Sequence, residues 1–194
     1  PQNPLNISAE RSVADEDRPH RFVLSYDYEV PVGRGKAFLG NANRLVDGVL
    51  GGWTVAGILT ITSGQLASLT VTGNPSNTGG PDRPNVVHDW HLASGQSLQH
   101  WFDTTAFVLN APYTYGNAGR NLLRGPHHTN LDFAIYKAFR ITERVGLQFR
   151  AEAFNATNTP AFDAPNAQVG APAFGAINSA DTPRNLQAGL KVIF

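Results

Sequence analysis

The sequence contains no cysteine, which excludes disulfides, iron–sulfur clusters, thiolate zinc sites and thiol nucleophiles. It also lacks an excess of charge of either sign, because 15 basic residues balance 15 acidic ones, so nucleic acid is not expected as a partner. Charged residues make up only 15% of the chain, which is low for the surface of a soluble protein.

Long apolar helices are missing as well. Residues 48–81 carry no charge, but glycine interrupts this stretch repeatedly, and no part of it reaches the roughly 20 apolar residues that a transmembrane helix needs. With 19 glycines and 13 prolines, the chain is expected to contain few helices. Contact with a membrane would therefore be made by strands.

Catalytic and metal-binding motifs are absent. The sequence has no G-x-S-x-G elbow, no H-E-x-x-H pair and no phosphate-binding glycine motif, so an enzyme is not expected. Histidines occur together with aspartates or with one another at two places in a predicted loop. The first place has His88, His91 and His100 near Asp82 and Asp89, and the second has the pair His127 and His128. Their spacing is more typical of solvated loop residues than of a zinc site. Neither a metal nor a cofactor is predicted.

Five segments alternate between apolar and polar residues with a period of two, which is typical of strands that have two different faces. These segments are residues 21–30, 53–62, 131–139, 145–154 and 185–194. Each has about ten residues, the length that a tilted strand needs to cross the hydrocarbon layer. Lys137 interrupts the apolar face of the third segment near one end, where a basic side chain can reach a membrane interface.

The connections between these segments differ in length as the two sides of an outer-membrane barrel do. Residues 140–144 form a short connection and are predicted to be a periplasmic turn. The long stretches 63–130 and 155–184 are rich in Asn, Gly, Pro and Thr and are predicted to be extracellular loops. Residues 31–52 are long for a periplasmic connection, and Asn43 is expected to cap a short helix there that ends at Gly51.

Short motifs are spread along nearly the whole chain: DRPHRF (17–22), LGGW (50–53), YGNAGRN (115–121), LRGP (123–126), FRITE (139–143), LQFRAE (147–152) and Phe154 with Asn155 and Asn158. Taken together, these motifs resemble those of the Oar-like TonB-dependent receptors. The resemblance implies a Gram-negative outer-membrane barrel of roughly two dozen strands, closed around a plug and energised by the TonB complex. The plug and the TonB-binding box are missing, so residues 1–194 are expected to be one C-terminal segment of that barrel. The predicted fold is all-β, with about five antiparallel transmembrane strands and long extracellular loops.

Candidate functional residues lie at the C-terminus and on polar strand faces. Gln187, Gly189, Val192 and Phe194 resemble the signal that the barrel-assembly machinery reads, although an ordinary amphipathic last strand would look the same. Arg120 and Arg124 are candidates for binding an anionic solute or a lipid phosphate, or for pairing with Asp132 or Glu152. Arg150 and Glu152 are expected to line the inner wall of the barrel.

Two functions from different classes remain open. The first is active uptake of a scarce solute across the outer membrane, for which the resemblance allows siderophores, cobalamin, oligosaccharides or peptides. The second is a soluble or surface-attached β-sandwich that binds carbohydrate or mediates adhesion, which predicts shorter strands. Because five strands alone leave two unpaired sheet edges, we expect the isolated chain neither to span a membrane stably nor to stay soluble without detergent.

Overall fold

The computed structural model describes residues 1–194, which divide into two compact units. The sheet unit comprises Arg21–Ile61, Thr129–Pro160 and Thr182–Phe194. The loop unit comprises Pro1–His20, Thr62–His128 and Ala161–Asp181. None of the helices combines the length and the apolar character needed to traverse a bilayer.

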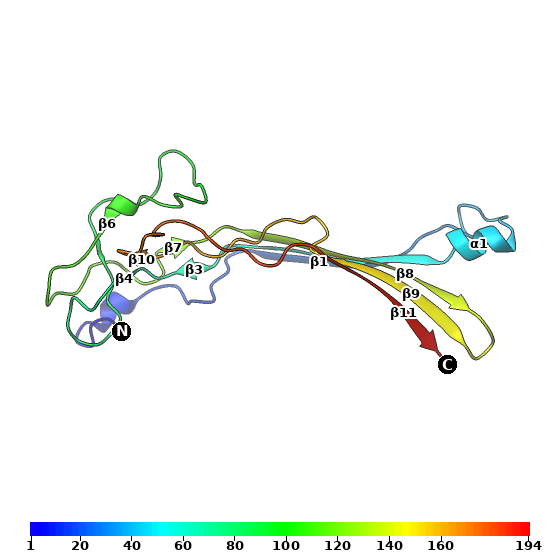
Figure 1. Ribbon diagram of the computed structural model, residues 1–194, viewed down its shortest axis with the longest axis horizontal. Helices are drawn as coiled ribbons and strands as arrows, with labels where there is room; N and C mark the ends of the chain where they lie inside the picture. The colour runs from blue at the N-terminus through cyan, green and yellow to red at the C-terminus, as the bar shows by residue number, and fades with distance from the viewer. The chain divides into compact units, whose positions relative to one another are not determined.

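The sheet unit contains a single five-stranded antiparallel sheet, which confirms the predicted all-β fold. In spatial order its strands are β1 (Arg21–Glu29), β2 (Trp53–Thr62), β8 (His128–Arg140), β9 (Gly146–Phe154) and β11 (Asn185–Ile193). Figure 1 shows β8, β9 and β11 side by side. Strand β8 is longer than the alternation predicts, because it begins at His128 instead of Leu131. The short turn between β8 and β9 is present, since Arg140 pairs with Gly146.

The strand register separates the sheet into two chemically different faces. Phe133 of β8 lies opposite Ala153 of β9, which in turn lies opposite Leu186 of β11. Residues that lie opposite one another in this way share a face. The apolar face therefore carries Phe133, Ile135, Phe139, Leu147, Phe149, Leu186, Leu190 and Val192, and the polar face carries Tyr136, Gln148, Arg150, Glu152, Gln187 and Lys191.

Strands β1 and β2 continue these faces. The backbone nitrogen of Val30 donates to Trp53 O at 2.8 Å, and the Trp53 ring meets the Phe149 ring edge-on at 6.0 Å, which puts Trp53 on the apolar face. Gly57 is needed where β1, β2 and β8 approach one another. A Cβ at this position would lie 2.5 Å from Tyr26 Oη and 2.9 Å from Asp132 O.

Most of the apolar face of the sheet unit is not covered by protein. The edge strands β1 and β11 are exposed along their whole lengths, and on the apolar face Leu186 and Leu190 are 67% and 69% exposed. A contiguous apolar surface of this kind marks contact with a partner or with membrane lipid rather than with water. The sheet therefore has the outward face of a membrane barrel.

The loop unit has a hydrophobic core of its own, which the sequence did not reveal. Three pairs of two-residue strands frame it: β3 (Leu66–Ala67) with β7 (Leu123–Arg124), β5 (Asn85–Val86) with β6 (Phe107–Val108), and β4 (Thr70–Val71) with β10 (Gln168–Val169). The unit also contains the 3-10 helices η1 (Ile7–Glu10) and η2 (Thr104–Ala106). Phe102 meets Phe107 and Phe174 edge-on at 5.5 and 5.3 Å. The long connections are thus ordered structure rather than open loops.

One short α-helix, α1 (Arg44–Leu50), belongs to the connection between β1 and β2. The Asn43 side chain accepts a hydrogen bond from Val46 N at 2.9 Å, which confirms the predicted cap. The helix ends at Leu50, and the backbone N–H of the next residue, Gly51, donates to Asp47 O. Figure 1 places α1 at the same end of the sheet as the β8–β9 turn and the C-terminus.

Candidate functional site

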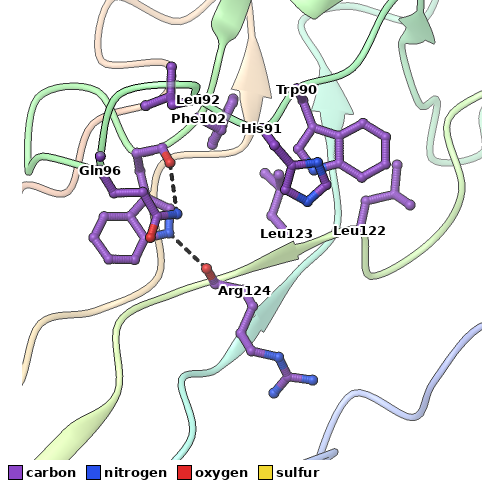
Figure 2. Close-up of a pocket in the computed structure, with 10 residues that line it drawn as sticks. Trp90, His91, Leu92, Gln96, Phe102, Leu122, Leu123 and Arg124 are labelled. Atoms are coloured by element: carbon purple, nitrogen blue, oxygen red, sulfur yellow. Dashed lines mark hydrogen bonds between the residues drawn. The ribbon is translucent and has the colours of Figure 1, made fainter.

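A pocket of about 400 Å³ lies in the loop unit between aromatic side chains (Figure 2). Its walls are Trp90, His91, Leu92, Gly95, Gln96, Trp101, Phe102, Leu122, Leu123 and Arg124. These residues come from the connection between β5 and η2, from β7 and from the residue before β7. Pockets with aromatic walls and a few polar groups are the usual form of small-molecule sites.

Hydrogen bonds and stacking fix the pocket walls before any ligand arrives. Trp101 Nε1 donates to Arg124 O at 2.7 Å, and Gln96 Nε2 donates to Trp101 O at 3.0 Å. The Trp90 and His91 rings stack with their centroids 5.0 Å apart, as Figure 2 shows. Both Trp90 and Trp101 also pack against the loop-unit core. The hydrogen bonds and the packing therefore preorganise this wall.

Arg124 contributes its backbone to the pocket, while its charge is used elsewhere. Its guanidinium donates to Asp17 Oδ2 at 2.6 Å and to Gly64 O at 3.0 Å. Figure 2 shows this group directed away from the aromatic walls. The predicted partners Asp132 and Glu152 are not the ones found, because an acidic residue of the N-terminal segment takes their place.

Arg120 follows the same pattern. Its guanidinium donates to both carboxylate oxygens of Asp15, at 2.7 and 2.6 Å. The Arg120 hydrogen bond, followed by one from Asn121, holds the pKa of the Asp15 carboxyl below its usual value. Both arginines that were candidates for binding an anionic solute are therefore paired with carboxylates of residues 15–17.

A third arginine, Arg83, was not singled out in the sequence. Its guanidinium forms two hydrogen bonds with the Glu10 carboxylate, at 2.9 and 2.7 Å, and its side chain is only 8% exposed. This hydrogen-bonding lowers the pKa of Glu10 to about 2. Nearby, Gln2 accepts from Arg83 N at 2.6 Å and donates to Gly116 O at 2.8 Å. Three ion pairs thus fasten residues 2–17 to the rest of the loop unit, although no local pattern in that segment predicts it.

The loop histidines form separate pairs. His88 Nε2 lies 3.1 Å from Asp103 Oδ2, and His91 Nδ1 lies 2.6 Å from Asp89 Oδ1. The pKa of Asp89 is lowered, first by the backbone N–H of His91 and then by its ring. His128 contacts Phe162 O at 2.7 Å. No group of three or more acidic or histidine side chains is arranged to hold a metal ion.

The polar face of the sheet unit carries a chain of polar contacts. Arg150 Nη2 donates to Glu152 Oε1 at 2.6 Å, and Gln187 Nε2 donates to Glu152 Oε2 at 2.5 Å. The Tyr136 hydroxyl donates to Asp27, and the Arg150 guanidinium lies over the Tyr136 ring at 5.8 Å. A shallow pocket of about 220 Å³ lies on this face beside Arg150 and Glu152. This face has the chemistry of a water-filled barrel wall.

The candidate assembly signal divides between the two faces of β11. Gln187 and Gly189 lie on the polar face, and Val192 lies on the apolar face opposite Leu147. A Cβ at Gly189 would meet nothing within 4 Å, so packing does not require glycine there. Phe194 is 97% exposed, so packing within the chain does not explain it either. The outer edge of β11 has no strand beside it in this sheet.

Comparison with known proteins identifies the family. A family model described as an outer membrane beta barrel domain matches residues 1–187. No curated protein and no solved structure matches the chain. The match covers all but the last residues of a chain whose one large sheet has an uncovered apolar face and a polar face. The chain therefore belongs to the outer membrane beta barrel domain family, and its place is the outer membrane of a Gram-negative bacterium.

Proposed function

We propose that the chain is the C-terminal part of a TonB-dependent receptor barrel that takes up a scarce solute. The observation that carries this proposal is the preformed aromatic pocket in the loop unit, because a purely structural barrel has no need of an ordered pocket in its long connections. The resemblance to Oar-like receptors supports the same function. The sandwich alternative does not hold, because the five strands have 9 to 13 residues and the family is one of membrane barrels.

The proposal assigns a side of the membrane to each set of connections. The short β8–β9 turn and α1 would face the periplasm, and the connections that build the loop unit would face the medium. The aromatic pocket would then meet solutes before they enter the barrel. Its stacked Trp90 and His91 rings suit a solute with a flat face, such as a sugar ring or an aromatic chelator.

Two partners complete the proposal. The barrel-assembly machinery would pair with the free edge of β11, as an added strand does in β-augmentation. The TonB complex would engage an N-terminal box that residues 1–194 do not include. Energised transport would therefore be a property of the whole receptor.

Uptake by whole cells tests the function. Cells with the complete receptor would be compared with cells lacking it for accumulation of a labelled ferric siderophore, cobalamin, an oligosaccharide and a peptide. We expect one of these to accumulate only when both the receptor and TonB are present. Equal accumulation of all four without TonB would indicate a passive pore and would contradict the proposal.

A variant of the aromatic pocket tests whether the solute binds there. Trp90→Ala removes one stacking surface of the pocket, and because base–aromatic or sugar–aromatic stacking contributes about 1–3 kcal/mol, we expect solute affinity to fall by about tenfold or more. Tyr113→Ala is the matched control, since Tyr113 is an aromatic residue that is 79% exposed and does not line the pocket. Equal loss in both variants, or in neither, would place recognition elsewhere.

A further inference from the structure

Lys137 is a buried cation on the apolar face of the sheet. Its side chain projects on the same face as Phe149 and Leu190, and the residue is only 4% exposed. A charged group facing hydrocarbon is costly unless it is neutralised or hydrogen-bonded. The question is therefore what covers this lysine in the outward face of a barrel.

The end of α1 covers it. Lys137 Nζ donates to Gly48 O at 2.7 Å, to Asp47 O at 3.4 Å and to Gly51 O. The last carbonyls of a helix lack partners within the helix and carry partial negative charge, so a lysine is a suitable partner for them. The ammonium also lies 5.6 Å from the centre of the Trp53 ring. The Lys137 ammonium and the last carbonyls of α1 thus satisfy each other's hydrogen-bonding capacity where the lysine is shielded from water.

These contacts fix the side of the sheet on which α1 lies. Lys137 and Trp53 are both on the apolar face, and Trp53 Nε1 donates to Val49 O at 2.9 Å. The C-terminal end of α1 therefore sits against the apolar, outward face and not against the polar face that lines the barrel. In the family to which the chain belongs, the outward face is the one that meets lipid.

The helix has an apolar surface that nothing in the chain covers. Leu45 and Val49, one turn apart, are 83% and 66% exposed, and Leu50 is 49% exposed. Before the helix, Phe38 is 63% exposed. Arg44 lies on the opposite side of the helix from the centre of this apolar surface.

We propose that α1 and the loop before it form an interfacial anchor, in which Leu45 and Val49 enter the acyl region of the bilayer and the basic residues bind phospholipid phosphates. The occupant is lipid because the apolar surface of α1 continues the lipid-facing side of the sheet through Trp53 and Lys137. Charge fits as well, since the side chains of Arg34 and Arg44 form no ion pair. This proposal rests on the membrane placement of the chain and is independent of solute uptake.

Depth-dependent quenching tests the anchor. Single labels are placed at Leu45→Cys and Arg44→Cys in the complete barrel protein, in a background without other cysteines, and the protein is reconstituted in phosphatidylethanolamine–phosphatidylglycerol vesicles. Each site would carry an environment-sensitive dye, with nitroxides placed either on the acyl chains or on the headgroups. We expect acyl-chain nitroxides to quench the Leu45 dye about twofold more than the Arg44 dye, because such helices bury their apolar face in the headgroup–acyl boundary.

The contrary outcomes are equally clear. If neither dye is quenched from the acyl chains, α1 stands in water or is covered by a protein, and the proposal fails. If both dyes are quenched equally, the helix has no apolar side facing lipid, and the proposal also fails. The phosphate contact is tested with the Leu45 dye: replacing Arg34 and Arg44 by Gln should lower its quenching by acyl-chain nitroxides, because the basic side chains no longer hold the helix to the headgroups. Unchanged quenching after both replacements would overturn that contact.

Discussion

Replacing Glu10 by Gln removes the charge that holds residues 1–17 to the loop unit most tightly. The Glu10 carboxylate accepts two hydrogen bonds from Arg83 and one from Gln2 N at 3.0 Å. Its side chain is 16% exposed, and that of Arg83 is 8% exposed. Removing one member of such a pair leaves the other charge poorly solvated and without its partner.

The size of the effect follows from the pKa of Glu10. Each pKa unit corresponds to about 1.4 kcal/mol, so lowering the pKa from 4.5 to about 2 stabilises the docked segment by roughly 3 kcal/mol. Because Glu10 keeps some contact with water, we expect the substitution to cost about 2 kcal/mol, which corresponds to a roughly 30-fold larger equilibrium constant for opening of the segment. A carboxyl with a depressed folded pKa contributes fully above its unfolded value, so this stabilisation is present above pH 4.5 and is lost as the pH falls toward 2.

Hydrogen exchange of the peptide that covers residues 1–17, measured in detergent micelles, follows this opening directly. After correction for the intrinsic rate at each pH, protection in the unchanged chain should fall between pH 4.5 and 2, and in Glu10→Gln it should be low at both ends. Asp15→Asn is the control, because the Asp15–Arg120 pair is 59% and 40% exposed, and its loss should change protection little. Wild-type protection in Glu10→Gln at pH 7 would refute the reasoning.

Three further substitutions test other parts of the structure. Gly57→Val places a side chain against Tyr26 and Asp132 O, so the free energy of unfolding of the barrel should fall by about 1–3 kcal/mol and its unfolding temperature in detergent should be lower. Gly189→Ala places its methyl group in open space and should unfold like the unchanged protein. Lys137→Met leaves the last carbonyls of α1 without their cation, so tryptic cleavage after Arg44 should become faster by about tenfold or more. The control Lys36→Met, in an exposed pair with Glu29, should leave the cleavage rate unchanged. An unchanged rate in both variants would show that Lys137 does not hold α1. Phe194→Ala should lower the amount of protein found in the outer-membrane fraction. The unfolding temperature of the assembled protein should stay the same, because Phe194 makes no packing contact to lose. A normal amount of protein in the outer membrane would show that Phe194 is not part of the assembly signal.

The strands of the sheet could be predicted from the sequence because a membrane-spanning strand meets lipid on one side and polar groups on the other. Apolar and polar residues therefore alternate with a period of two along β1, β8, β9 and β11. The structure places these strands within a few residues of the predicted ranges. The cap of α1 was predictable for a similar reason, since Asn43 acts on a residue three positions away. Local chemistry is sufficient for both.

The loop unit could not be predicted in the same way. Its core joins Leu69, Phe102 and Val169, which are far apart in the sequence, and the strands that frame it have only two residues each, too short to show a period. The partners of Arg120 and Arg124 were missed because Asp15 and Asp17 lie more than a hundred positions away in a segment without a pattern. The alternation predicts that Lys137 reaches a membrane interface, but no local pattern indicates that the end of α1 covers it.

Cysteine accessibility in living cells tests the placement of the chain most directly. Single cysteines would be introduced at Ser94 in the loop unit, at Glu143 in the β8–β9 turn and at Leu190 on the apolar face, all exposed in the structure. A membrane-impermeant maleimide should label Ser94→Cys in intact cells, Glu143→Cys only after the outer membrane is permeabilised, and Leu190→Cys in neither state, because lipid covers it. Labelling of Glu143→Cys but not Ser94→Cys in intact cells, or rapid labelling of Leu190→Cys, would contradict a lipid-facing sheet with an outward loop unit.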